Sequence, residues 1–258
     1  MARKSRKKNI YKRLFFWLLF INSLFLIYFI SQKPKWASSL EFKLKSIFSD
    51  INIPKGNYTY GIDVSEYQGV INWKKISKQN SNYVVGFTLI RATAGKNHRD
   101  RFYTSNWRES KKIKLLRGAY HYYRPNENST EQAENFIANV KLEPGDLPPV
   151  LDVEQLSKIQ TPKSLKVGIK NWLKLVENHF GIKPILYTGT HFYRDNLNDL
   201  DNYPIWIANY NQIKNPLPEK DWIMWQFTDE GIVDGILGPV DLDLFRGDQK
   251  DLNKYLLK

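Results

Sequence analysis

Leu147-Pro148-Pro149-Val150-Leu151-Asp152-Val153-Glu154 is an apolar, strand-like run that ends in two carboxylates. Side chains alternate between the faces of a β-strand, so Asp152 and Glu154 are expected on one face, with Cα atoms roughly 6–7 Å apart. Two carboxylates this close repel each other when both are ionised, which raises the pKa of one of them. A protonated acid beside an ionised one suits cleavage of a glycosidic bond. Two solvated acids at a strand end would give the same motif, so the motif alone leaves the function open.

Short apolar runs alternate with polar, helix-like segments from about Tyr58 onward, which is typical of βα units and a largely parallel sheet. More strands than helices are expected, which predicts an irregular, TIM-like α/β barrel. Ser129 and Gln132 have the spacing of a capping box. The strands are expected at 60–64, 83–92, 118–123, 150–154, 184–188, 205–209, 223–227 and 240–242, and the helices at 73–78, 102–114, 130–140, 162–179 and 191–197.

Two further acids stand at the ends of predicted strands, where a barrel gathers its active-site groups. Asp63 ends one strand and Asp241 follows a turn with Gly238. In one barrel, these two acids would meet Asp152 and Glu154 at a single mouth.

Aromatic side chains at the same ends could stack on sugars or pack in the core, and both alternatives stay open. Gln226 is a better candidate for binding than Trp225, because strand alternation puts the two on opposite faces. His121 is expected to be a structural histidine. The predicted substrate-binding residues are Tyr122, Tyr187, Trp206, Tyr210 and Gln226.

The composition excludes several kinds of site. The chain has no cysteine, so disulfides, thiolate metal sites and a cysteine nucleophile are absent. Its four histidines lack metal-ligand spacing, and no cofactor or metal is expected. The net charge is +13, of which seven charges lie within residues 1–13, leaving 13 − 7 = +6 for the rest. This mild excess suits an anionic envelope polymer or membrane surface, although solvated lysines explain it equally well, and we expect no nucleic acid partner.

An uncharged run over residues 14–30 follows the basic head of residues 1–13 and is just long enough to span a bilayer as a helix. The basic flank is expected to stay in the cytoplasm, which places the catalytic domain outside the cell. No A-x-A-like cleavage site follows directly, so an uncleaved anchor is favoured over a signal peptide. Residues 31–57 are interpreted as a stalk and residues 58–250 as one catalytic domain, expected to be a monomer.

An ordered set of motifs makes the chain resemble glycoside hydrolase family 25, the Chalaropsis-type lysozymes. The resemblance implies an irregular α/β barrel that cleaves the β-1,4 bond between N-acetylmuramic acid and N-acetylglucosamine in peptidoglycan. Many members carry a glutamate with glycine after the Arg-Ala-Thr strand, where this chain has Ala94-Gly95. The motifs are Gly61-Ile62-Asp63-Val64-Ser65, Ile90-Arg91-Ala92-Thr93, Gly118-Ala119-Tyr120-His121-Tyr122, Val150-Leu151-Asp152-Val153-Glu154, Leu186-Tyr187-Thr188-Gly189, Trp206-Ile207-Ala208-Asn209, Trp225-Gln226-Phe227 and Val240-Asp241-Leu242-Asp243.

The resemblance further implies that Glu154 is the proton donor and Asp152 its partner, with Asp63 and Asp241 as the other acids of the cleft. Glu154 would protonate the glycosidic oxygen and later deprotonate a water, with retention of configuration. Asp152 could attack the anomeric carbon or orient the 2-acetamido group of the substrate. Substrate assistance is slightly favoured, because two acids on one strand would have difficulty approaching the sugar from both sides.

Two other function classes remain. A non-catalytic protein that binds envelope glycans could keep the cleft, although the intact Asp152 and Glu154 count against it. Hydrolysis of chitin would fit a longer DxxDxDxE pattern, which the chain lacks. An anchored hydrolase is expected to act on the wall of its own cell.

Overall fold

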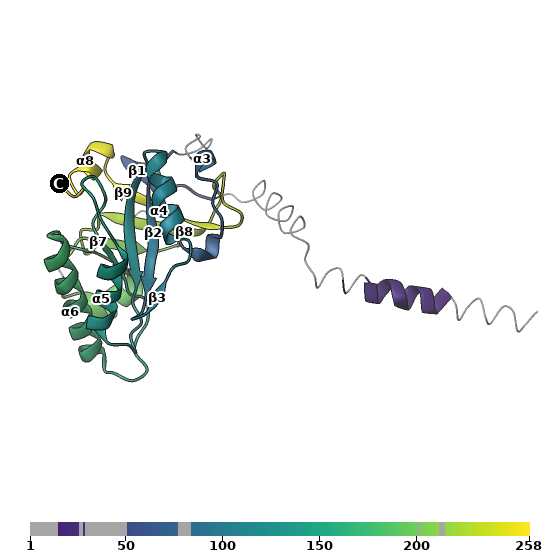
Figure 1. Ribbon diagram of the computed structural model, residues 1–258, viewed down its shortest axis with the longest axis horizontal. Coiled ribbons are helices and arrows are strands. Elements are labelled where there is room, and N and C mark those ends of the chain that lie inside the picture. Colours follow the sequence, from purple (N-terminus) through teal and green to yellow (C-terminus); the bar gives the residue numbers. More distant parts are fainter. Residues whose placement is uncertain (1–14, 26–27, 29–50, 77–83, 201, 212–214) are drawn as a thin grey trace, which may run out of the picture. The chain divides into compact units, whose positions relative to one another are not determined.

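The computed structural model describes residues 15–25, 28, 51–76, 84–200, 202–211 and 215–258 (Figure 1). The chain divides into two compact units, Met1–Ser49 and Asp50–Lys258. Residues 15–25 of the first unit form a helix. Within the described ranges, we find no helix with the length and apolar character needed to cross a membrane. The remainder of the predicted run over 14–30, apart from Tyr28, lies outside the described residues, as do the basic head and most of the predicted stalk.

The second unit is built on one sheet, in which the described residues form nine strands. The strand order is β1-β9-β8-β7-β6-β5-β4-β2-β3, and β1 also pairs with β2, so the first eight strands in this order close into a barrel. The short β3 is added as a hairpin to the edge of β2. The strands are β1 Tyr58–Val64, β2 Val85–Ala94, β3 His98–Arg99, β4 Leu116–Tyr122, β5 Val150–Asp152, β6 Ile185–Gly189, β7 Ile205–Ala208, β8 Met224–Gly231 and β9 Val240–Arg246.

The barrel is parallel except where it closes. Strands β1, β2 and β4 to β8 run in the same direction, whereas β9 is antiparallel to both of its neighbours, β1 and β8. This reversal puts the beginning of β9 beside the ends of the other strands, with Asp241 directly opposite Asp63. The predicted fold class, an irregular α/β barrel with fewer helices than strands, is confirmed.

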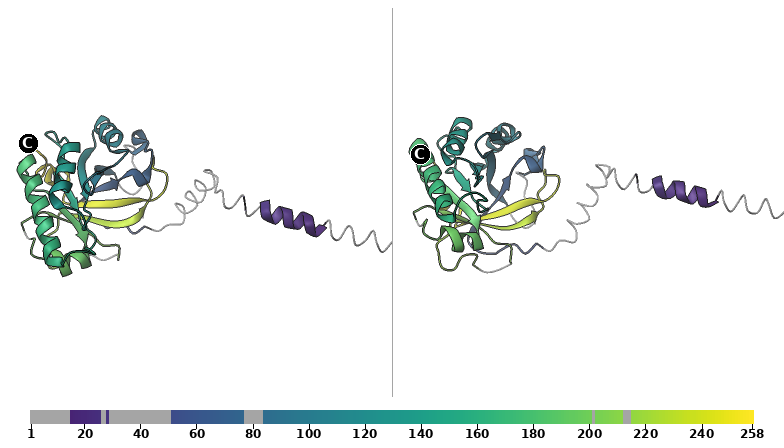
Figure 2. Two further views of the ribbon diagram at one scale, coloured as in Figure 1. Left: turned by 60° about the horizontal axis from the view of Figure 1, so that its bottom comes forward. Right: turned by 90° about the horizontal axis from the view of Figure 1, so that it is seen from below.

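Helices pack on the outside of the sheet, and α5 and α6 lie side by side (Figures 1 and 2). Thr161 caps α6 by accepting a hydrogen bond from the backbone N–H of Ser164, Pro162 is its first residue, and Gly181 ends it with φ at +70°. The helices are α3 Trp73–Ile76, α4 Tyr103–Lys112, α5 Ser129–Asn139, α6 Pro162–Phe180, α7 Thr190–Phe192 and α8 Gln249–Asn253, with a 3-10 turn at Glu66–Gln68 and a π-helical turn at Tyr193–Leu197.

Two apolar clusters stabilise the barrel from its two sides. The larger lies between sheet and helices and includes Ile90 and the fully buried Trp172 of α6. The smaller includes Phe87, Leu89 and Val150, each fully buried. Because side chains on one face of a strand recur every second residue, the face that carries Val150 next presents Asp152. The apolar interior therefore forms the floor beneath the polar barrel mouth.

Two local expectations were wrong, and two short elements were missed. The predicted capping box of Ser129 and Gln132 is replaced by Asn128, whose side chain accepts hydrogen bonds from the first backbone N–H groups of α5, while Gln132 is buried. Strand β5 ends at Asp152, so Glu154 lies just beyond the strand. The short elements β3 and α8 were not predicted.

Candidate active site

A cleft of about 410 Å³ opens at the barrel mouth. It collects the ends of the parallel strands and the beginning of β9. All nine of the predicted site residues line it: Asp63, Tyr122, Asp152, Glu154, Tyr187, Trp206, Tyr210, Gln226 and Asp241.

Asp152 and Glu154 form a pair of neighbouring carboxyls in the cleft. Asp152 is only 5% exposed, and its Oδ1 atom has no hydrogen-bond partner within the described part of the chain. Burial, together with the charge of Glu154 and a hydrogen bond between the two carboxyls, raises the pKa of Asp152 well above its usual range. Glu154 is exposed at the mouth, but partial desolvation of its carboxyl still raises its pKa, against the opposing effect of that hydrogen bond. Burial therefore favours the protonated form of a carboxyl in this pair.

Gln226 connects a third acid to two tyrosines. Its Nε2 atom donates to Oδ2 of Asp63 at 2.7 Å, and its Oε1 atom accepts hydrogen bonds from the hydroxyl groups of Tyr187 and Tyr210. Gln226 is 3% exposed and Asp63 6%. Burial, then the charges of Asp241 and Asp243, raise the pKa of Asp63 well above its ordinary value, whereas the bond from Gln226 opposes this shift. Gln226 thus orients three groups of the cleft at once.

Asp241 and Asp243 both belong to β9. Burial, followed by the charge of Asp229, raises the pKa of Asp241 to about 7. Asp243 is fully buried, and its Oδ1 atom accepts a hydrogen bond from Nε1 of Trp206 at 3.0 Å. Burial and the charge of Asp241 raise the pKa of Asp243 well above its ordinary value. The sequence analysis did not select Asp243, although its spacing from Asp241 puts both on one face of β9.

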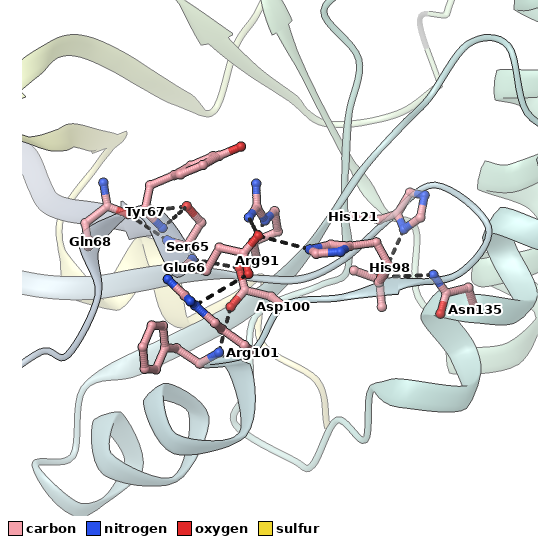
Figure 3. A network of polar contacts seen from close by, with 12 residues as sticks. Ser65, Glu66, Tyr67, Gln68, Arg91, His98, Asp100, Arg101, His121 and Asn135 are labelled. Carbon is pink, nitrogen blue, oxygen red and sulfur yellow. Dashed lines mark hydrogen bonds and ion pairs between the residues drawn. The ribbon is translucent and has the colours of Figure 1, made fainter.

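One wall of the cleft is an ion-pair network that begins at Glu66 (Figure 3). The guanidinium of Arg91 donates to Oε1 of Glu66 at 2.9 Å and to Oδ2 of Asp100 at 3.1 Å. Nε2 of His98 lies 3.1 Å from Oε1 of Glu66. The ring of Tyr67, which is 82% exposed, lies over Arg91 at 4.8 Å. Burial would raise the pKa of Glu66, but Arg91 and His98 outweigh it and lower that pKa. Glu66 is thereby held ionised and is unsuited to proton donation.

His121 is a structural histidine, as predicted. It is fully buried and stacked on Trp172, with Nδ1 at 2.7 Å from Oγ1 of Thr93 and Nε2 at 3.2 Å from Oε1 of Gln132. Burial lowers its pKa to about 3. In the part of the chain that the structure describes, no three histidine or acidic side chains are arranged to hold a metal ion.

The profile of glycosyl hydrolases family 25 matches residues 62–236 of this chain. The chain belongs to this family. It is accordingly a glycoside hydrolase, and the profile covers Asp63, Asp152 and Glu154.

Curated relatives of this chain include three bacterial proteins. The chain is 40% identical to the uncharacterized protein YegX of Escherichia coli K12 over 80% of its own length and 76% of the relative's. It is 31% identical to the autolytic lysozyme of Clostridium acetobutylicum, covering 72% of this chain and 55% of that one. With lysozyme M1 of Streptomyces globisporus the identity is 28%, over 72% and 67% of the two chains.

Solved structures of the family have the same fold. A family 25 glycosyl hydrolase from Bacillus anthracis superposes with a TM-score of 0.72 at 30% identity, covering 81% of this chain and all of the other. A bacterial lysozyme from Streptomyces coelicolor superposes with a TM-score of 0.68 at 26% identity, covering 77% of this chain and 96% of the other.

Proposed function

We propose that this family 25 hydrolase is a muramidase that cleaves the β-1,4 bond between N-acetylmuramic acid and N-acetylglucosamine in peptidoglycan. The observation that carries the proposal is the gathering of Asp63, Asp152, Glu154 and Asp241 in one cleft. Several carboxyls in one partly desolvated site stabilise positive charge on an anomeric carbon and retain a proton for the leaving oxygen. The names of the lysozyme relatives support peptidoglycan as the substrate.

Glu154 acts as acid and then as base in this mechanism. Its proton passes to the glycosidic oxygen while the bond from that oxygen to the anomeric carbon breaks. In the second step it removes a proton from the water that attacks the same carbon. Two displacements at one carbon give net retention. The exposure of Glu154 at the mouth supports this role, since a water molecule must reach it.

Asp152 orients the 2-acetamido group of the substrate, whose carbonyl oxygen attacks the anomeric carbon. The Oδ1 atom of Asp152, which has no hydrogen-bond partner among the described residues, supports this assignment, because it can accept the amide N–H as positive charge develops on the acetamido group. Asp152 and Glu154 are also only two positions apart in the chain, which makes it difficult for them to approach the sugar from opposite faces.

The test is digestion of purified peptidoglycan by the full-length protein, followed by mass spectrometry of the borohydride-reduced fragments. Wild type is expected to create reduced muramic acid ends, and Glu154→Gln none. Glu134→Gln is the matched control, since Glu134 is an exposed glutamate of α5 outside the cleft. Reduced glucosamine ends would overturn the bond assignment. Wall binding without release would show a glycan-binding protein instead.

We also propose that residues 14–30 anchor the protein in the membrane with the catalytic unit outside. The support is the sequence order of a basic head followed by an uncharged run. Membrane fractionation followed by alkaline extraction is expected to retain the chain in the membrane pellet. Recovery of the protein only in a soluble, secreted form would defeat this location.

A further inference from the structure

Asp243 is a fully buried acid on β9 that the mechanism above does not use. Its Oδ1 atom accepts the hydrogen bond from Trp206, whereas no N–H or hydroxyl group of the described residues donates to its Oδ2 atom. Asp243 is also not among the residues that line the cleft. An ionised oxygen buried without a donor is costly. Contact with the substrate therefore does not account for this carboxyl.

Two other buried acids are matched by buried arginines. Arg91 donates to Asp100, and Arg117 donates to Asp146. Among the described residues no other arginine and no lysine is buried, so no buried cation is left for Asp243. A buried carboxyl without a cation favours its protonated form, because burial penalises the charge. The folded protein is therefore expected to keep a proton at Asp243.

The group beside Asp243 is a second carboxyl, that of Asp63. Asp243 is paired with Gly61 across the β1–β9 seam, and strand alternation puts Asp63 on the same face, two residues further along β1. The side chains of Asp243 and Asp63 are hydrogen-bonded to each other. Two carboxyls can form such a bond only when one of them is protonated. The two acids consequently hold one proton between them.

The surroundings of this pair favour the negative charge on Asp63. Oδ2 of Asp63 accepts the 2.7 Å hydrogen bond from Gln226, and its carboxyl lines the cleft. Asp243 lies deeper, where its Oδ2 atom has no other described donor. The proton is thus best placed on Asp243, from which it is donated to the carboxylate of Asp63.

The charges around the pair also favour retention of the proton. Burial and the charge of Asp241 raise the pKa of both carboxyls well above their ordinary values. The titratable or charged groups that face the pair or its neighbours are Asp241 on β9, Asp152 on β5, Tyr120 on β4, Tyr187 on β6, Tyr210 after β7 and, on β2, Arg91, which is engaged by Glu66 and Asp100.

We propose that Asp243 is a positioning residue, whose shared proton holds the carboxylate of Asp63 in place in the cleft. This rests on the proposed function, in which carboxylates of the cleft stabilise positive charge on the reacting sugar. The pair then carries one negative charge instead of two, and the charge is on the member that borders the cleft. Asp243 acts through Asp63 and does not contact the substrate.

The first test compares Asp243→Asn with Asp243→Leu in the full-length protein, with purified peptidoglycan as substrate. Asparagine can accept from Trp206 and donate an amide N–H to Asp63, so its kcat is expected to stay within about threefold of wild type. Leucine has a similar size but makes neither bond. Its kcat is expected to fall about 10- to 100-fold, the factor for one lost hydrogen bond to a charged group, with KM nearly unchanged.

Two outcomes of this comparison would overturn the proposal. An asparagine variant as impaired as the leucine variant would show that the enzyme needs a charge on Asp243 and not a proton. A leucine variant with the kcat of wild type would show that Asp243 does not position Asp63.

A second test needs no turnover and applies even if the leucine variant does not fold. Urea unfolding of full-length Asp243→Asn and wild type is measured at pH 5 and pH 8. The folded state binds the proton of Asp243 more tightly than the unfolded state does, so wild type loses stability as the pH rises above 3.8. Asparagine does not titrate, and the urea midpoint of Asp243→Asn is expected to gain on that of wild type between pH 5 and pH 8.

The matched control is Asp146→Asn, which makes the same change at a buried acid outside the cleft. It removes the charged partner of Arg117 and is expected to lower the urea midpoint at both pH values. A midpoint difference between Asp243→Asn and wild type that does not change with pH would overturn the shared proton. If the difference grows but wild type releases nothing from peptidoglycan, the muramidase proposal fails and the shared proton stands.

Discussion

Replacing Asp241 with asparagine is expected to stabilise the folded protein at neutral pH while lowering its activity. Burial, with the charge of Asp229, raises the pKa of Asp241 from 3.8 to about 7. The folded state therefore binds this proton more tightly than the unfolded state does. The stability that results is fully present below pH 3.8 and is lost as the pH rises through 7. Asparagine has no carboxyl to ionise, so the Asp241→Asn variant does not lose this stability as the pH rises.

The size of the effect follows from the two pKa values. A carboxyl with these values in the unfolded and folded states lowers the free energy of unfolding by about 2 kcal/mol at pH 5 and about 4 kcal/mol at pH 7, relative to low pH. The stability advantage of Asp241→Asn over wild type should thus grow by about 2 kcal/mol from pH 5 to pH 7. The charge of Asp241 also raises the pKa of Asp63 and of Asp243. Removing that charge lowers both pKa values, which adds to the stability gained at neutral pH.

Urea unfolding, followed by tryptophan fluorescence at pH 5 and pH 7, measures this difference. Asp221→Asn is the control, since that carboxylate is 99% exposed and should show no growing advantage. Digestion of peptidoglycan at pH 8, where Asp241 is ionised in the folded protein, is expected to be slower with Asp241→Asn, because one negative group of the cleft is lost. A stability difference that stays constant with pH would refute the reasoning, as would a variant that loses stability relative to wild type between pH 5 and pH 7.

Two further substitutions probe the barrel mouth and the barrel wall. Gln226→Met leaves the buried Asp63 and Tyr187 without this hydrogen-bond partner, so it is expected to lower the free energy of unfolding in urea by about 2–6 kcal/mol and to abolish activity. Tyr210→Phe should lower it by less than about 1 kcal/mol, because Tyr210 is 44% exposed. Gly61→Ala places a Cβ atom 2.4 Å from the ring of Phe87 and should lower the free energy of unfolding by about 1–3 kcal/mol. Gly189→Ala, whose Cβ atom would have nothing within 4 Å, should be neutral, and equal effects of the two substitutions would contradict the packing argument.

The barrel was predictable because its strands carry continuous apolar runs. Strands such as β6 and β7 are buried on both faces, and that burial requires apolar residues at successive positions. Acids that interrupt or end such runs are costly unless a site uses them, so Asp63 and Asp152 were identifiable without coordinates. A strand was predicted at the short apolar piece 240–242, whereas its antiparallel pairing with β1 was not.

Contacts between segments distant in the sequence could not be predicted. The capping-box spacing of Ser129 and Gln132 is a local signal, and it failed because the Gln132 side chain is buried against the backbone of Arg124. The network of Glu66 and Arg91 joins the turn after β1 to β2, and nothing in either segment specifies the other partner. Asp243 could have been found from alternation alone, since it follows Asp241 at the period of a strand.

The seam between β1 and β9 also bears on how the enzyme is made. Asp63 lies on the first strand of the barrel and Asp241 on the last, yet the two are directly paired across the seam. A nascent chain that ends before β9 has an open sheet edge and lacks one carboxyl of the cleft. The complete set of acids therefore assembles only after β9 has left the ribosome. A prematurely terminated product is a defective hydrolase, so the order of synthesis itself delays the appearance of a complete active site.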